Sequence, residues 1–133
     1  MAQGLAIALP LSVSEIDGAY RTHKDLISMA EQNLKMLILT SPGERCMTPD
    51  FGIGIRRYLF EQNITPRRQE ILTNIKKQAA QYLPYIEIVD LDVFSPPAVG
   101  NTGDIDTTRL NVSLTYIIPT VNIGSNLTIP VSA

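Results

Sequence analysis

The stretch that decides the fold is Thr40-Ser41-Pro42-Gly43-Glu44-Arg45-Cys46-Met47-Thr48-Pro49-Asp50-Phe51-Gly52, which separates two helical patterns. We call residues 40–52 the connector. Proline fixes φ and glycine accepts a positive φ, so Pro42-Gly43 predicts a type II turn. Residues 44–47 fit a brief strand that Pro49 ends, and Gly52 loosens the backbone. We expect Phe51 to anchor the connector in the core.

Length and composition favour one compact domain with no unusual partner. The chain has 133 residues and a net charge of -2, and its basic residues form no stripe, so a nucleic-acid partner is not indicated. The single cysteine, Cys46, cannot make an internal disulfide, which suits the cytoplasm. The apolar run from Leu5 to Leu11 is short and contains Pro10, so it fits neither a signal peptide nor a membrane span.

Before the connector, the sequence predicts an arm and then a helix. Residues 1–20 read as an extended N-terminal arm that either packs back on its own domain or reaches a neighbour. A helix is expected from Thr22, with Thr22 and Asp25 as a capping pair, and it ends before Pro42. Its apolar stripe predicts a core-facing side rather than a groove for a partner helix. The stripe consists of Leu26, Ile27, Ala30, Leu34, Leu37 and Ile38.

After the connector, residues 53–60 suggest a short helix, and a long helix follows. Thr65 is expected at its N-cap, Pro66 at its first position and Pro84 just past its end. Arg67 and Arg68 lie in the first turn, where the helix dipole disfavours cations. Either solvent and salt screen this cost, or the two arginines join Arg56 and Arg57 in a basic patch for an acidic partner.

The last third of the chain predicts a small antiparallel sheet. The apolar phase switches within residues 86–94, which indicates a β-bulge near Ile88 or a strand covered on both faces. Residues 95–106 read as a hairpin loop, and residues 110–118 alternate as a half-buried strand. After a break at residues 124–126, a final strand near Leu127 to Val131 would carry Pro130 and lie at the sheet edge. The fold class is therefore α+β in a single domain, with N-terminal helices followed by the sheet.

No set of residues indicates catalysis, a cofactor or a metal. His23, the only histidine, is expected in the first helical turn, and Cys46 reads as a structural residue. Gly52-Ile53-Gly54 is only a fragment of a phosphate loop. Four aspartates at alternate positions could face a cation across the hairpin loop, without the spacing of a known calcium loop. These are Asp90, Asp92, Asp104 and Asp106.

The stretch from Leu37 through Gly52, which includes the connector, together with Leu59-Phe60-Glu61, resembles the baseplate wedge and sheath-initiator family. Members of this lysozyme-like wedge family occur in contractile phage tails, type VI secretion and related injection systems. The resemblance covers the chain from about Tyr20 onward and implies one α+β domain over residues 21–133. Within it, Pro42, Gly43, Pro49 and Gly52 read as residues that fix the connector. Glu44 and Arg45 read as a structural ion pair or a partner contact.

The resemblance implies assembly rather than turnover, at a six-fold baseplate of a virion built in the host cytoplasm. The expected partners are other wedge proteins and the tail sheath protein, with the tail tube or hub as further candidates and neither nucleic acid nor membrane. The family often carries Glu-Pro-Arg after its second long helix, where this chain has Leu83-Pro84-Tyr85. This departure favours an apolar docking surface over a salt-bridged one.

The unpaired edge near Leu127, Ile129 and Val131 is expected to pair with a strand of the sheath protein. Removing the residues after Gly124 should then leave the domain folded and stop sheath assembly. Two alternatives remain open: an anti-adapter-like regulatory module of the same fold, and a cell-wall hydrolase. The hydrolase would use carboxyl groups such as Glu44 and Glu61.

Overall fold

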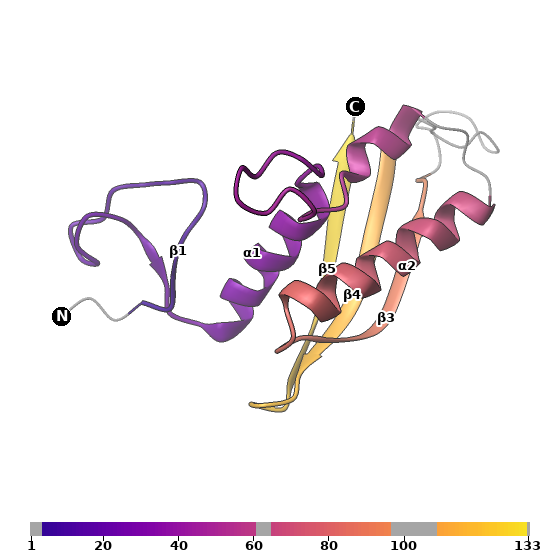
Figure 1. The fold of residues 1–133 in the computed structure, drawn as a ribbon. Helices are drawn as coiled ribbons and strands as arrows, with labels where there is room; N and C mark the ends of the chain where they lie inside the picture. The colour runs from indigo at the N-terminus through magenta and orange to yellow at the C-terminus, as the bar shows by residue number, and fades with distance from the viewer. Residues whose placement is uncertain (1–3, 61–64, 97–108, 133) are drawn as a thin grey trace. The chain divides into compact units, whose positions relative to one another are not determined.

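The computed structural model describes residues 4–60, 65–96 and 109–132. Two compact units, residues 1–35 and 36–133, make up the chain and are described separately. The predicted boundary between an arm at residues 1–20 and a domain at residues 21–133 stays a prediction. Figure 1 traces the chain from its N-terminal strand to the last strand of the sheet.

The first unit begins with a two-stranded antiparallel sheet and leads into a helix. Strand β1 (Ala6–Ile7) pairs with β2 (Thr22–His23), and helix α1 runs over Leu26–Leu39. The predicted helix start at Thr22 and the Thr22–Asp25 capping pair are wrong, because Thr22 and His23 are extended and paired with β1. The helix begins after Asp25, whose carbonyl oxygen accepts a hydrogen bond from the Met29 N–H at 3.2 Å.

One side chain of α1 holds the arm. The Gln32 amide donates to the Ile7 carbonyl at 2.9 Å, and its oxygen accepts from the Leu9 N–H at 2.9 Å. The side-chain amide therefore bonds β1 as a neighbouring peptide group would. His23 Nε2 lies 2.8 Å from the same Gln32 oxygen, so His23 is a strand residue facing Gln32 rather than part of a helical turn. The arm thus packs back on the chain's own first unit.

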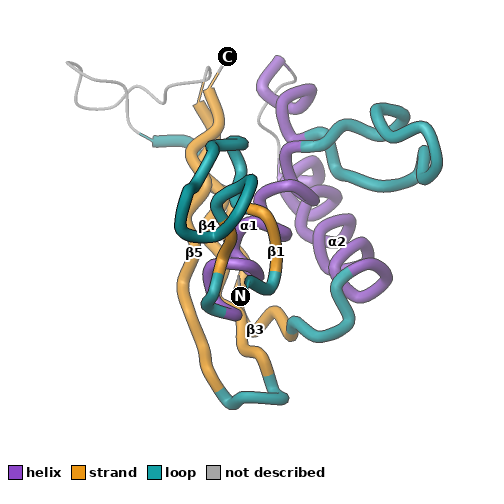
Figure 2. The backbone as a smooth tube through the Cα atoms, turned by 90° about the vertical axis from the view of Figure 1, so that its left-hand side faces the viewer, coloured by secondary structure: helices purple, strands orange, loops and turns teal. Residues whose placement is uncertain are grey.

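The second unit is a three-stranded antiparallel sheet with helices against it, which confirms the α+β class. The strands are β3 (Glu87–Phe94), β4 (Arg109–Ile118) and β5 (Ile123–Ser132), in the order β3-β4-β5. Helix α2 (Thr65–Tyr82) contacts β3, and the 3-10 helix η1 (Ile55–Phe60) contacts β5. Figure 2 shows the helices and the strands of this unit from the side.

Burial follows the predicted alternation on β4. Leu110, Val112, Leu114, Tyr116 and Ile118 are buried, while the residues between them are not. The register of β3 on β4 shifts between Ile88 and Asp90, which makes Val89 the extra residue and confirms the predicted bulge. The change in apolar phase along β3 therefore has a local cause in the backbone.

Strand β5 is longer than expected. It runs without interruption from Ile123 to Ser132, so the predicted break at residues 124–126 is wrong. The chain instead turns just before β5, at Asn122, which has a φ of 53°. Among the described strands β5 pairs only with β4, and this confirms that the strand with Pro130 lies at an edge.

Candidate functional site

The connector opens with the predicted turn. Glu44 N–H donates to the Ser41 carbonyl at 3.1 Å, and Gly43, the third residue of this four-residue turn, has a φ of 94°. Both observations fit a type II turn with Pro42 second. Gly43 N–H also reaches the Pro49 carbonyl at 2.8 Å, which closes the loop on itself. The brief strand expected over residues 44–47 is wrong, because this segment is exposed and bends within that closed loop.

Glu44 and Arg45 take separate partners. The Glu44 carboxylate accepts the Ser41 N–H at 3.0 Å, and the Arg45 guanidinium lies 3.8 Å from the centre of the Phe51 ring. Among the ion pairs between described residues, none joins these two side chains. Glu44 thus caps the turn, and Arg45 covers an aromatic ring. Contact of either residue with a partner stays a prediction.

Phe51 anchors the connector as predicted. Its ring is only 7% exposed and meets the Tyr82 ring edge-on at 5.0 Å, at an interplanar angle of 72°. Gly52 has a φ of 103°, and a Cβ there would lie 2.2 Å from the Thr40 carbonyl oxygen. Position 52 thus accepts only glycine, both for its backbone conformation and for the close approach of Thr40.

Sequence reasoning missed Gln78, which fastens the connector to α2. Its amide donates to the Asp50 carbonyl at 2.8 Å, and its oxygen accepts the Gly52 N–H at 3.3 Å. A polar residue beside the buried face of α2 was the available signal, since Gln78 lies between Ile75 and Ala79 and is half-buried.

The predicted wedge-docking residues lie at and near the two ends of α2. Leu83 is buried, Pro84 is exposed and Tyr85 is half-buried, so an approaching partner would meet mainly the last two. A shallow hollow of about 240 Å³ beside them is lined by Ala79, Ala80 and Ile86 among others. At the other end, Arg67 pairs with Glu70 at 3.1 Å, which offsets the unfavourable dipole. Arg68 is half-buried beside it.

Pro130 shows which residues of β5 turn their backbone N–H and C=O groups away from β4. Pro130 lies opposite Asn111, and because proline has no N–H this pair cannot exchange both ladder hydrogen bonds. Opposed pairs alternate along antiparallel strands, so Pro130 and the other even-numbered residues turn their backbone groups away from β4. The outward N–H groups of β5 therefore include those of Asn126 and Thr128.

The odd-numbered residues of β5 have the opposite role. Leu127, Ile129 and Val131 are buried, and by the same alternation their backbone groups bond to β4. The odd-numbered residues hold the edge strand on β4, while the even-numbered residues direct their backbone groups outward. The expectation that truncation after Gly124 leaves the domain folded is therefore wrong, because the truncation would remove three core side chains.

The residues weighed for chemistry form no metal-binding group in the part of the chain that the structure describes. Cys46 is exposed in the connector, and Glu61, Asp104 and Asp106 lie outside the described residues. Within residues 4–60, 65–96 and 109–132, no three His, Cys, Asp or Glu side chains are grouped to hold a metal ion. Over the same ranges no helix is both long and apolar enough to cross a membrane.

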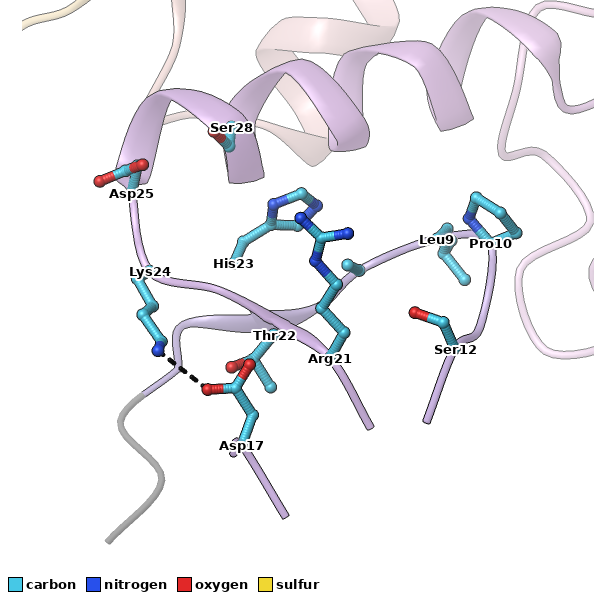
Figure 3. A pocket seen from close by; sticks show the side chains of 11 residues that line it. Leu9, Pro10, Ser12, Asp17, Arg21, Thr22, His23, Lys24, Asp25 and Ser28 are labelled. Atoms are coloured by element: carbon cyan, nitrogen blue, oxygen red, sulfur yellow. Dashed lines mark ion pairs between the residues drawn. The ribbon is translucent and has the colours of Figure 1, made fainter. Parts of the chain in front are cut away.

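A hollow of about 830 Å³ lies within the first unit (Figure 3). Lys24 and Asp17 form an ion pair across 2.9 Å on its wall, and the hydrogen bond from Lys24 lowers the pKa of the Asp17 carboxyl. Arg21 and Asp25 also line it, so its charges nearly balance and select neither anions nor cations.

Comparison with known families explains the connector and the sheet together. Residues 26–122 match the family described as baseplate wedge protein gp25. The chain belongs to this family. The matched range holds α1, the connector, α2 and the first two strands of the three-stranded sheet, and it ends just before β5. The predicted resemblance is thereby confirmed, and with it the assignment to a family of baseplate wedge proteins.

Two solved structures share the fold of this wedge-family chain. One is a crystal structure of a candidate tail lysozyme from Geobacter sulfurreducens, with 24% identity, a TM-score of 0.67, and coverage of 84% of this chain and 95% of that one. The other is a chain of the anti-feeding prophage baseplate, solved with 6-fold symmetry. It has 23% identity, a TM-score of 0.62, and coverage of 85% and 83%. No protein of curated function matches the sequence.

Proposed function

We propose that this wedge-family chain is a structural, non-enzymatic subunit of a contractile-tail baseplate and that it starts sheath polymerisation at β5. The observation that carries the proposal is the outer edge of β5, which pairs with no other described strand and is held to the core by Leu127, Ile129 and Val131. An extended strand of the sheath protein would pair along this edge and continue the sheet.

The same proposal assigns the wedge contacts to α2. Pro84 and Tyr85, with Leu83 beneath them, form an apolar end beside the hollow between α2 and β3, and Arg67 and Arg68 form a basic end. Other wedge proteins would dock on the first, and an acidic partner would meet the second. Six copies around a tail tube or hub, in a virion assembled in the host cytoplasm, complete the proposed setting.

The test removes one outward N–H without removing a bond to β4. In Thr128→Pro the proline ring replaces an N–H that faces away from β4. Pro130, two residues further along, already lacks an N–H on the same side of the strand. We expect the isolated chain to keep its fold and the number of sheathed baseplates in electron micrographs to fall about tenfold, since the added strand would lose a ladder hydrogen bond and leave an acceptor unpaired, at a cost of about 1–3 kcal/mol.

Two matched variants complete this experiment. Thr128→Ala keeps the N–H and should assemble sheaths normally, whereas Leu127→Pro removes an N–H directed at β4 and should unfold the sheet. Normal sheaths on folded Thr128→Pro baseplates would rule out strand addition at β5. A one-to-one complex with a protease adaptor, and no place in a particle, would favour the anti-adapter alternative instead.

A second candidate function, cell-wall hydrolysis, draws support from the candidate tail lysozyme that shares the fold. Against this function, the Glu44 carboxylate accepts a hydrogen bond from the Ser41 N–H in an exposed turn. Glu44 is also exposed, whereas a glycosidase places two carboxyl groups on either side of the sugar bond. Lysis of peptidoglycan by the purified chain, lost in Glu44→Gln or Glu61→Gln, would establish the hydrolase.

A further inference from the structure

The sheet has two edge strands among the described residues, and β3 is the second. The direction of the backbone groups on β3 follows from the pairing of β4 with β5. The even-numbered residues of β4 bond to β5, so the odd-numbered ones bond to β3, where Ser113 faces Asp92 and Thr115 faces Asp90. The backbone N–H groups of Leu91 and Val93 on β3 therefore turn outward, away from β4.

One of these outward donors already has an acceptor. Leu91 N–H donates to the carboxylate of Asp90, its own neighbour, at 3.0 Å. A charged acceptor makes this a favourable hydrogen bond, and an incoming strand would have to break it before pairing there. The Leu91 bond also confirms the phase deduced from Pro130, since an N–H pointing at β4 would be bonded to the ladder.

Two further features oppose pairing on β3. Val89 bulges out of the ladder one residue before Asp90, which bends the strand and breaks its pairing register. Glu87, Asp90 and Asp92 are exposed along the strand, and charged side chains on an edge oppose an added strand. By contrast, the exposed residues of β5 from Gly124 to Ser132 are uncharged.

We propose that Asp90 closes the β3 edge to strand addition and so restricts the sheet to a single added strand, on β5. The partner on β5 is an extended protein segment, and that part rests on the proposed function. The closure of β3 is a property of the isolated chain. An open second edge would let a second copy pair through β3, and copies joined in that way would be withdrawn from assembly.

The experiment compares two variants that remove the same charge and add the same side chain. Asp90→Val frees the Leu91 N–H, whereas Asp92→Val leaves the Asp90 bond in place. Sedimentation at rising concentration should show self-association for Asp90→Val beyond that of the unaltered chain, and none beyond it for Asp92→Val. In dilute solution, the Leu91 amide should exchange with solvent about five- to tenfold faster in Asp90→Val, as expected for one lost hydrogen bond.

A third variant separates the bond from the charge. Asp90→Asn keeps a side-chain oxygen that can accept the Leu91 N–H, so it should protect this amide and remain as unassociated as the unaltered chain. Unchanged Leu91 exchange and sedimentation in Asp90→Val would overturn the inference, and so would equal self-association of Asp92→Val. None of these outcomes depends on sheath assembly, so Thr128→Pro can fail in its own test without affecting this one.

Discussion

The connector and the arm are both irregular segments, but they are held in different ways. The connector places an aromatic ring in the core and forms two hydrogen bonds with Gln78 of α2, one accepted by the Asp50 carbonyl and one donated by the Gly52 N–H. The arm leaves apolar side chains exposed, with Val13 at 81% and Ile16 at 88%, and polar contacts hold it: the pairing of β1 with β2, the Asp17–Lys24 ion pair and the Gln32 amide. The two segments therefore differ in what they bury, and side-chain loss should be costlier in the connector than in the arm.

The largest expected effect breaks the connector. Phe51→Ala removes a buried ring that contacts Tyr82 and Arg45, so it should lower the free energy of unfolding by about 3–5 kcal/mol. Chemical denaturation of the isolated chain measures this change. Phe51→Leu, which keeps most of the buried volume, is the control and should lose much less. A Phe51→Ala chain as stable as the unaltered one would mean that the connector is not anchored by this ring.

A smaller effect is expected in the arm. Gln32→Ala removes the hydrogen bonds to Ile7 and Leu9 of the arm, so the Leu9 amide should exchange with solvent about fivefold faster, which corresponds to the roughly 1 kcal/mol of one hydrogen bond. Gln32→Glu keeps an acceptor for Leu9 and should fall between the two. The amides of β4 should not change in either variant. Equal loss of amide protection in the arm and in β4 would show that the arm and the three-stranded sheet do not open independently.

The smallest effect concerns pH. The pKa of Asp17 is lowered by its bond to Lys24, so the carboxylate is favoured in the folded arm. Its contribution is present above the unfolded pKa of about 3.9 and is lost as pH falls through the lower folded value. Relative to the intrinsic exchange rate, which itself slows on acidification, the protection of the amides in residues 17–24 should therefore decrease below about pH 4. Asp17→Asn should remove this pH dependence, and a variant that still shows it would exclude Asp17 as its source.

The sequence predicted the parts of the fold that depend on local pattern. The alternation of β4, the bulge near Ile88, the Pro42-Gly43 turn and the burial of Phe51 each follow from residues close together in the chain. The start of α1 was missed because Thr22 has a fair capping sequence but pairs with Ile7, fifteen residues away in the chain. Pairing at a distance overrode a weak local preference.

The edge strand was predicted in position, but the direction of its backbone groups was not. Pro130 located the edge strand from its sequence alone, yet which backbone groups face outward required its register against Asn111. The same holds for Asp90, which read as one of four alternating carboxylates until the register of β3 placed the Leu91 N–H beside it. Single residues suggest that an edge exists, and the pairing of strands shows which of its backbone groups face outward.

Gly52 has a consequence for genetic screens of assembly. Any other residue there would collide with the Thr40 carbonyl, so every substitution at this position should score as a loss of particles. A screen that counts only infective or sheathed particles would then map position 52 as a binding surface, although Gly52 is buried against Thr40. Measuring the amount of soluble folded chain alongside particle yield would separate such folding positions from the edge positions that we propose on β5.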